Sequence, residues 1–303
     1  MPPDCSKYEV AVAGGGIAGL SAALAAARLG RRTLVLAGDV LGGNLLSIEA
    51  VEGYPGYPEG VPGYELVPAA QAMAAEAGAE FEMLPLLSVA RNSAGYALGT
   101  AEGERTAKAL IVATGASPRK LGVPGEERLA GKGVSHCASC DGPMLRGARV
   151  AVVGGGDSAM QEALTLARYA ARVVLLCRGA ELRGQATYRD RVRASANIET
   201  RFQAQVAAIE GDAAVSGVQL ASGERLDVAA VFTYIGLQPN TTFLRDVVPL
   251  DAAGKIGADG AMATETPGLF AAGLARAGSP GRAIASAGEG AAAAASAHRF
   301  LGG

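Results

Sequence analysis

The chain contains two stretches in which apolar and polar residues follow the same order. The first opens with the mainly apolar run Tyr8–Ala13, passes through a glycine-rich turn into the alanine-rich stretch Ala18–Arg28, and ends with Thr33–Leu36. Short apolar runs bounded by glycine predict buried strands, and an alanine- and leucine-rich stretch of this length predicts a helix. We therefore predict a strand, a tight turn, a helix and a second strand in this order.

The second stretch repeats this order further along the chain. Val150–Val153 is the predicted strand, Ser158–Ala170 the helix and Arg172–Leu176 the next strand. The turn after the first strand reads GxGxxG in one stretch and GxGxxA in the other. Between a strand and a helix this pattern indicates dinucleotide binding, because the glycines let the backbone approach a pyrophosphate at the helix N-terminus. The candidate residues are Gly14, Gly16 and Gly19 in the first turn, and Gly154, Gly156, Asp157, Ser158 and Ala159 in the second.

Three further segments complete the predicted organisation. Ala109–Gly115 is an apolar strand that ends in a Thr-Gly turn, Phe232–Gly236 has a similar character, and Ala283–Leu301 is an alanine-rich terminal helix. Prolines and glycines after both apolar segments predict two hinges. The predicted fold is α/β, with two Rossmann-like dinucleotide-binding domains, the second inserted into the first: residues 1–117 and 244–303 form one domain, and residues 118–243 form the other.

Composition narrows the class of protein. The 303 residues carry a net charge of −2 without a basic cluster, which argues against nucleic acid or an anionic membrane as a partner. The uncharged run Ala11–Ala27 holds the glycines of the first turn and is predicted to be neither a signal sequence nor a membrane span. The four cysteines, Cys5, Cys137, Cys140 and Cys177, form one close pair and two singles, unlike a secreted disulfide scaffold. We therefore expect a cytoplasmic protein.

The close pair Cys137 and Cys140 is the strongest candidate for chemistry. Two thiols at this spacing close into a disulfide with little backbone movement, and a thiolate of lowered pKa can attack an external disulfide. Asp141 can shuttle the proton, and His136 either lowers the pKa of a neighbouring thiol or faces a turn. A zinc site normally needs four ligands, and the chain has only two other cysteines and two histidines, so we expect no metal.

The residues that follow the second strand of each stretch bear on which nucleotide binds. Arg178 and Arg183 follow that strand in the second stretch, and no acidic residue occurs between the end of the strand and Glu181. An arginine there suits the 2′-phosphate of NADPH, whereas an acid would accept the 2′-OH of NADH. The alternative is that both arginines are solvated surface charges. In the first stretch Asp39 is the candidate for the ribose contact.

Seven motifs distributed along the chain point to one family. They are GGGIAGL at Gly14, GGNL at Gly42, VEGYPGYPEG at Val51, ATGASPRKLGVPGE at Ala113, GVSHCASCDG at Gly133, VAVVGGGDSAMQEAL at Val150 and GLFAAG at Gly268. With these motifs the chain resembles the low-molecular-weight thioredoxin reductases over nearly its whole length. The combination of CAxCDG with GGGDSA shortly after it is highly specific for that family.

The resemblance implies a homodimer of two-domain subunits, with FAD in the discontinuous domain and NADPH and the cysteine pair in the inserted one. It further implies that Cys140 faces the flavin as the charge-transfer thiolate, that Cys137 attacks the partner's disulfide and that Asp141 donates the proton. One domain must then swing, so that the flavin meets first the nicotinamide and then the cysteine pair. Beside the first turn and Asp39, the residues expected to contact FAD are Gly43, Asn44, Thr114, Gly115, Gly273, Arg282 and Ala283.

The chain departs from this family in both cofactor regions. Gly179 stands where the motif for the NADPH phosphate usually has its second arginine. Leu274 stands where an aspartate usually binds the ribityl chain of FAD, and Gly281-Arg282 replaces an Arg-Gln pair at the flavin edge. Arg282 either stabilises reduced flavin or points to solvent.

Three functions fit these patterns. The leading one is a flavin-dependent disulfide reductase that takes electrons from NADPH and passes them to thioredoxin or a similar small disulfide substrate. The second is an NADPH-independent relative, either a ferredoxin-dependent reductase or a dithiol oxidase that uses O2. The third is a non-catalytic nucleotide-binding redox sensor.

Overall fold

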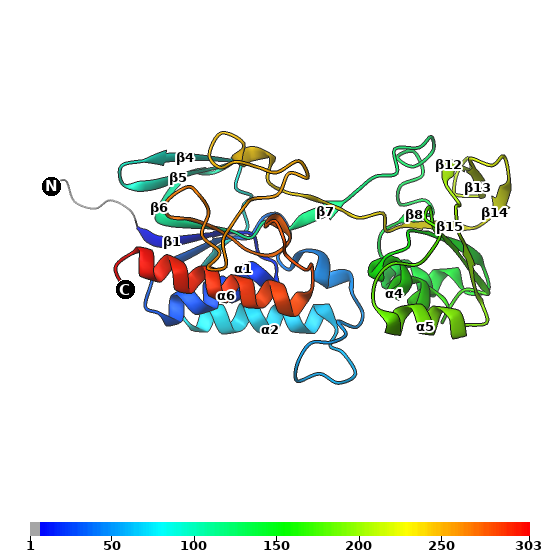
Figure 1. Ribbon diagram of the computed structural model, residues 1–303, viewed down its shortest axis with the longest axis horizontal. Coiled ribbons are helices and arrows are strands. Elements are labelled where there is room, and N and C mark those ends of the chain that lie inside the picture. The colour runs from blue at the N-terminus through cyan, green and yellow to red at the C-terminus, as the bar shows by residue number, and fades with distance from the viewer. Residues whose placement is uncertain (1–6) are drawn as a thin grey trace. The chain divides into compact units, whose positions relative to one another are not determined.

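The structure is a computed structural model that describes residues 7–303, so that Cys5 lies outside the described residues (Figure 1). The chain folds into two compact units. The first takes the chain up to Ser117 together with Gln238–Gly303, and the second is Pro118–Leu237. The predicted second boundary, between residues 243 and 244, lies slightly later in the chain than the observed one. Two short paired strands, β7 (Ala116–Pro118) and β16 (Leu237–Pro239), carry the chain across both boundaries.

The first unit is built on one mixed sheet with the order β3-β2-β1-β6-β5-β4, and β17 also pairs with β6. Its central strands β2, β1, β6 and β17 run parallel, whereas β4, β5 and the first half of β6 form an antiparallel meander. The bounds are β1 Tyr8–Ala13, β2 Thr33–Leu36, β3 Glu80–Glu82, β4 Ser88–Asn92, β5 Gly95–Thr100, β6 Gly103–Val112 and β17 Leu269–Ala271.

Helices α1 (Ile17–Arg28), α2 (Gly63–Glu76) and α6 (Ala283–Phe300) lie on one side of this sheet (Figure 1). Their alanines pack on Val10, Val12 and Ile111 in one hydrophobic core. Small residues let α1 and α6 approach closely, and a Cβ on Gly290 of α6 would overlap the backbone of α1 at Ala18. Three 3-10 turns complete the unit: η1 Gly43–Ser47, η3 Thr242–Leu244 and η4 Gly273–Ala275.

The second unit has a parallel sheet with the order β11-β10-β9-β15-β8. Helices α3, α4 and α5 pack on one side of it, and an antiparallel three-stranded sheet contributes apolar residues to the core on the other side. The bounds are β8 Val134–Ser135, α3 Ala138–Asp141, η2 Gly142–Leu145, β9 Arg149–Val153, α4 Asp157–Leu166, β10 Arg172–Leu176, α5 Ala186–Ala194, β11 Ile198–Arg201, β12 Val206–Glu210, β13 Gly217–Leu220, β14 Arg225–Asp227 and β15 Ala230–Thr233.

The structure confirms the predicted fold class and the two repeated strand–turn–helix stretches, and it corrects several ends. Helix α4 ends at Leu166 and not at Ala170: the N–H groups of Arg168 and Tyr169 donate to carbonyls three residues earlier, and the Asn197 side chain donates to the carbonyls of Ala167 and Ala170. Strand β6 begins well before Ala109, because its first half pairs with β5 in the meander. The contact from Asn197 comes from far along the chain, whereas β5 directly precedes β6 and forms a hairpin with it.

No helix within residues 7–303 is long and apolar enough to cross a membrane.

Candidate active site

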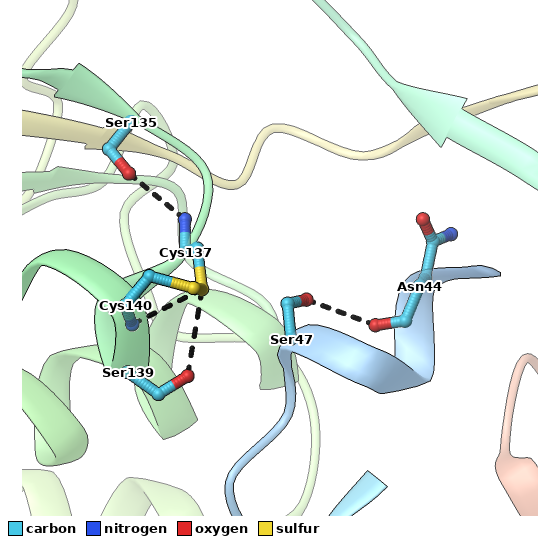
Figure 2. The surroundings of a disulfide bond; sticks show 6 residues. All are labelled: Asn44, Ser47, Ser135, Cys137, Ser139 and Cys140. Atoms are coloured by element: carbon cyan, nitrogen blue, oxygen red, sulfur yellow. Dashed lines mark hydrogen bonds between the residues drawn. A yellow bond between two sulfur atoms is a disulfide. The ribbon is translucent and has the colours of Figure 1, made fainter. Parts of the chain in front are cut away.

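The two cysteines of the CxxC pair form a disulfide inside the second unit. Cys137 caps the short helix α3, Cys140 lies within it, and their Cα atoms are 5.3 Å apart. Polar contacts fix this turn: the Cys137 N–H donates to Ser135 Oγ at 3.1 Å, and the Cys140 N–H donates to Cys137 Sγ at 3.2 Å (Figure 2). Ser139 Oγ lies 3.6 Å from the same sulfur. Cys140 is exposed and Cys137 half-buried, so a second reactant can reach the disulfide.

The residues on either side of the pair are held from within the same unit. His136 Nδ1 lies 2.9 Å from Thr233 Oγ1 and 3.1 Å from the Thr233 carbonyl oxygen, so the end of β15 fixes the imidazole. Asp141 ends α3, is half-buried, and donates its N–H to the Cys137 carbonyl at 3.2 Å. The candidate proton donor therefore sits on the same helical turn as the disulfide.

Tyr234 directly follows β15, and its hydroxyl oxygen is buried. Burial raises the pKa of this phenol well above its ordinary value, and the carboxylates of Glu162 and Asp141 raise it further. Glu162 is itself only 7% exposed. A raised pKa makes this phenol a weaker proton donor than an ordinary tyrosine. Of Tyr234 and Asp141, Asp141 is thus the better candidate for proton donation.

The glycine turn of the second unit leaves open space at the N-terminus of α4. Gly154 has φ +147° and presses against the Tyr234 carbonyl, where a Cβ would overlap it. Ala159 takes the third position, is fully buried, and packs against the same glycine. A Cβ on Gly156, the N-cap of α4, would meet no atom within 4 Å. This space, at the positive end of a helix, suits a pyrophosphate.

The loop that carries the two candidate arginines folds back onto this turn. The Arg183 N–H donates to the Gly155 carbonyl at 2.7 Å, and the Gln185 N–H donates to Asp157 Oδ1 at 2.7 Å. Asp157, a predicted cofactor ligand, thus anchors the loop through this oxygen, and Ser158 lies beside it, exposed, in the first turn of α4. The buried thiol of Cys177 supports the same loop by donating to the Glu181 carbonyl at 3.4 Å.

Both candidate arginines are available to a ligand. Arg178 and Arg183 are exposed, and within residues 7–303 neither side chain makes a hydrogen bond or an ion pair. Gly179, between them, has an ordinary backbone conformation, and a Cβ there would lie 3.7 Å from the Glu181 carbonyl oxygen. Nothing in the local geometry therefore requires glycine at this position.

The glycine turn of the first unit has the same construction. A Cβ on Gly14 would overlap the Ala113 carbonyl, and one on Gly19 would overlap the Gly14 carbonyl, so both close approaches require glycine. A Cβ on Gly16, the N-cap of α1, would meet no atom within 4 Å. The first unit thus also offers open space for a pyrophosphate at a helix N-terminus.

Asn240 joins two segments that the sequence analysis treated separately. Its side-chain amide donates to the Thr114 carbonyl, its N–H to the Gly115 carbonyl, and its Oδ1 accepts from Ser117 Oγ. Thr114 Oγ1 donates in return to the Asn240 carbonyl at 2.7 Å. The predicted cofactor residues Thr114 and Gly115 are therefore held by backbone and side-chain hydrogen bonds from the return segment.

The other predicted residues of the first unit have mixed surroundings. Asn44 follows Gly43 (φ +57°) and donates its side-chain amide to the Ala116 carbonyl at 2.8 Å, so this N–H is already used within the protein. Asp39 is exposed, beyond the end of β2, and its carboxylate makes no hydrogen bond or ion pair within residues 7–303. Ala283, half-buried, is the first residue of α6, and Arg282 caps this helix with its side chain exposed.

The turn at Gly273 is fixed by an ion pair that the sequence analysis missed. The Gly273 N–H donates to Glu289 Oε2 at 2.7 Å, and Glu289 Oε1 pairs with Arg276 at 2.7 Å, both side chains being largely buried. In the same loop a Cβ on Gly281 would lie 3.3 Å from Leu274 Cδ2. The two departures from the family pattern on the flavin side, Leu274 and Gly281, are therefore neighbours in space.

The residues missed by sequence reasoning share one property. Thr233, Tyr234, Asn240 and Glu289 act through partners distant in the chain, and no local spacing marks them. For Asn240 a signal existed, because a Pro-Asn pair follows an apolar strand there. Among the described residues no cluster of His, Cys, Asp or Glu is arranged to hold a metal ion.

Known proteins share both the sequence and the fold. The sequence profile of the pyridine nucleotide-disulphide oxidoreductases matches residues 8–290. A thioredoxin reductase of Treponema pallidum is 38% identical over 301 residues, covering 98% of each chain, and one of Mycolicibacterium smegmatis is 39% identical over 307 residues, covering 99% of each. The crystal structure of Lactococcus lactis thioredoxin reductase matches with a TM-score of 0.93 at 34% identity, covering 97% of this chain and 99% of that one. The chain therefore belongs to the pyridine nucleotide-disulphide oxidoreductase family, within its thioredoxin reductases.

Proposed function

We propose that this FAD-dependent disulfide oxidoreductase reduces a thioredoxin-like protein with electrons from NADPH, through the Cys137–Cys140 pair. One observation carries the proposal. The dipeptide Thr233-Tyr234 links the redox pair to a nucleotide turn inside one unit, because Thr233 holds His136 while the Tyr234 carbonyl presses on Gly154. A disulfide supported by the same strand end as a nucleotide turn suits electron transfer better than structural cross-linking.

The residues around each glycine turn divide into two proposed cofactor sites. Bound FAD supplies the two-electron step between a nicotinamide and a disulfide. We assign to FAD the turn Gly14–Gly19 with Asp39, Gly43, Asn44, Thr114, Gly115, Gly273, Arg282 and Ala283, and to NADPH the turn Gly154–Ala159 with Arg178 and Arg183. The open N-termini of α1 and α4 and the exposed side chains of Arg178 and Arg183 support this division.

The two cysteines carry the exchange with the substrate. Once the disulfide has taken up two electrons, Cys137 Sγ attacks one sulfur of the substrate disulfide and forms a mixed disulfide, and the other substrate sulfur leaves as a thiol with a proton from Asp141. Cys140 Sγ then passes its proton to Asp141 and attacks Cys137 Sγ, which restores the Cys137–Cys140 bond, and the second substrate sulfur leaves as a thiolate that takes a proton from water. The substrate gains two electrons and two protons, and the pair returns to its oxidised form.

An anaerobic titration of the purified protein tests the proposal. We expect NADPH to bleach the flavin absorbance band and the reduced protein to regain that band on addition of an oxidised thioredoxin. NADH at the same concentration should act much more slowly, because only NADPH offers a 2′-phosphate to Arg178 and Arg183. A flavin band that NADPH leaves unchanged would contradict the proposal.

Asp141→Asn is expected to slow disulfide turnover by about 100-fold, because general acid catalysis is lost while the side chain keeps its size. The rate at which NADPH reduces the flavin should not change, and stopped-flow absorbance separates the two steps. Asp212→Asn, an exposed acid of the same unit, is the matched control and should behave as the wild type. Equal turnover in both variants would show that Asp141 only supports α3.

The partner, the assembly and the compartment are part of the same proposal. A thioredoxin-like substrate and a homodimer follow from the family, and a cytoplasmic location follows from the single close cysteine pair. Sedimentation of the purified protein would decide the oligomeric state.

A second candidate function is disulfide chemistry without NADPH, with ferredoxin as donor or O2 as acceptor. Gly179 favours it, because the loop lacks one cation for the 2′-phosphate, and the packing of Leu274 beside Gly281 alters the flavin-side loop. In the titration above this candidate predicts a yellow protein that neither nucleotide reduces. A protein that retains no flavin at all would instead favour a redox sensor without turnover.

A further inference from the structure

Phe202 is an exposed aromatic residue at the carboxyl end of β11, and 46% of its surface is accessible. β11 is one edge strand of the parallel sheet and pairs in parallel with β10, the strand that leads into the arginine loop. Carboxyl ends of neighbouring parallel strands lie at the same edge of a sheet. Phe202 therefore lies beside the loop that carries Arg178 and Arg183.

Backbone hydrogen bonds tie the two loops together. The Cys177 N–H donates to the Arg201 carbonyl at 2.8 Å, the Gln203 N–H to the Gly179 carbonyl at 3.0 Å, and the Ala204 N–H to the Cys177 carbonyl at 3.0 Å. The position of Phe202 relative to the arginine loop is thus fixed by main-chain contacts on both sides of it.

The alternation of side chains along β11 shows which way Phe202 faces. Ile198 packs into the core beneath α4 and α5, so Phe202, an even number of residues later, falls on that same side. Arg201 falls on the opposite side, where it pairs with Glu199 and Glu224. The side of the sheet with Phe202 is also the side of α4, whose N-terminus offers the open space at Gly156.

Gln203 keeps Phe202 on the outside. It adopts the left-handed conformation (φ +53°), which is unfavourable for a residue with a side chain. Continued alternation would place Ala204 on the same side as Phe202, but Ala204 is buried in the core on the other side of the sheet. The left-handed conformation of Gln203 thus interrupts the alternation of side chains, so that Ala204 is buried while Phe202 remains exposed.

We infer that Phe202 is the stacking platform for the adenine of NADPH, an inference that rests on the proposed function. The adenine and the 2′-phosphate are attached to the same ribose, so a nucleotide whose phosphate is held by Arg178 and Arg183 carries its adenine within a few ångströms of them. An exposed aromatic face beside this loop binds the base by stacking, which requires no hydrogen bonds to it. Phe202 then contributes to affinity, whereas the arginines discriminate NADPH from NADH.

Calorimetry on the FAD-loaded full chain separates these two roles, with 2′,5′-ADP and ADP as probes. Phe202→Ala should weaken both probes about tenfold, because both contain adenine. Arg178→Ala should weaken 2′,5′-ADP alone. Phe202→Leu, which keeps an apolar side chain without a π face, should resemble the alanine variant. Unchanged affinity of Phe202→Ala for both probes would overturn the inference, while failure of the wild type to bind 2′,5′-ADP would overturn the proposed use of NADPH as well.

A second measurement uses the absence of tryptophan from the chain. Phe202→Trp introduces a single tryptophan, and we expect saturating 2′,5′-ADP to quench its fluorescence by stacking. Phe300→Trp, at a similarly exposed aromatic residue (50%) of the other unit, is the matched control and should show no change. Equal responses of the two variants to 2′,5′-ADP would contradict stacking on residue 202.

Discussion

Cys140→Ser is expected to abolish the reduction of a thioredoxin-like disulfide, by on the order of a thousandfold or more, while FAD stays bound. The variant keeps Cys137, which can still attack a substrate disulfide, but it has no second thiol to resolve the mixed disulfide. With a substrate variant whose single remaining cysteine carries thionitrobenzoate in a mixed disulfide, Cys137 displaces thionitrobenzoate, and a covalent complex should accumulate because neither protein keeps a thiol that could resolve it. A non-reducing gel and the flavin spectrum measure the two outcomes independently.

Two controls make this result specific. Cys137→Ser removes the attacking thiol, so it should also lose turnover but form no covalent complex. Cys5→Ser removes a thiol far from the pair in sequence and should behave as the wild type. Full turnover in Cys140→Ser would remove the pair from the mechanism, and a complex formed by Cys137→Ser instead would exchange the roles of the two cysteines.

Gly179→Arg is expected to strengthen NADPH binding by about ten- to a hundredfold. A hydrogen bond to a charged group contributes roughly 1.5–3 kcal/mol, and a second arginine beside Arg178 adds such a donor for the 2′-phosphate. The substitution should fold without strain, because position 179 has an ordinary backbone conformation and a Cβ added there would lie 3.7 Å from its nearest neighbour. The Michaelis constants for NADPH and NADH, measured side by side, report the effect.

The gain in NADPH affinity from Gly179→Arg should depend on the charge of the new side chain and on the 2′-phosphate of the nucleotide. Gly179→Gln adds a side chain that lacks the charge, and it should leave both Michaelis constants close to those of the wild type. NADH, which lacks the 2′-phosphate, should gain nothing from Gly179→Arg. An equal gain for both nucleotides would mean that the new side chain acts on another part of the cofactor.

Much of the candidate site could be predicted because its residues lie a few positions apart, within short sequence motifs. Both glycine turns, the cysteine pair and the arginines lie within local motifs whose chemistry requires those residue types at those intervals. The ends of the elements were less predictable. The carbonyls that follow α4 are bound by Asn197, which is distant in the chain, and β6 begins early because it forms a hairpin with β5, its neighbour in the chain.

The sequence by itself determined the fold class, the two nucleotide turns and the redox pair, because each depends on neighbours within a few residues. Only the tertiary structure decided which residues hold them in place. Thr233 lies within hydrogen-bond distance of His136, Asn240 is hydrogen-bonded to Thr114 and Gly115, and Glu289 accepts from the Gly273 N–H. It also placed Phe202 beside the arginine loop, through hydrogen bonds between two parallel strand ends. Such contacts join residues far apart in the chain, and a buried polar group takes whichever partner the packed fold brings within reach, which no local pattern records.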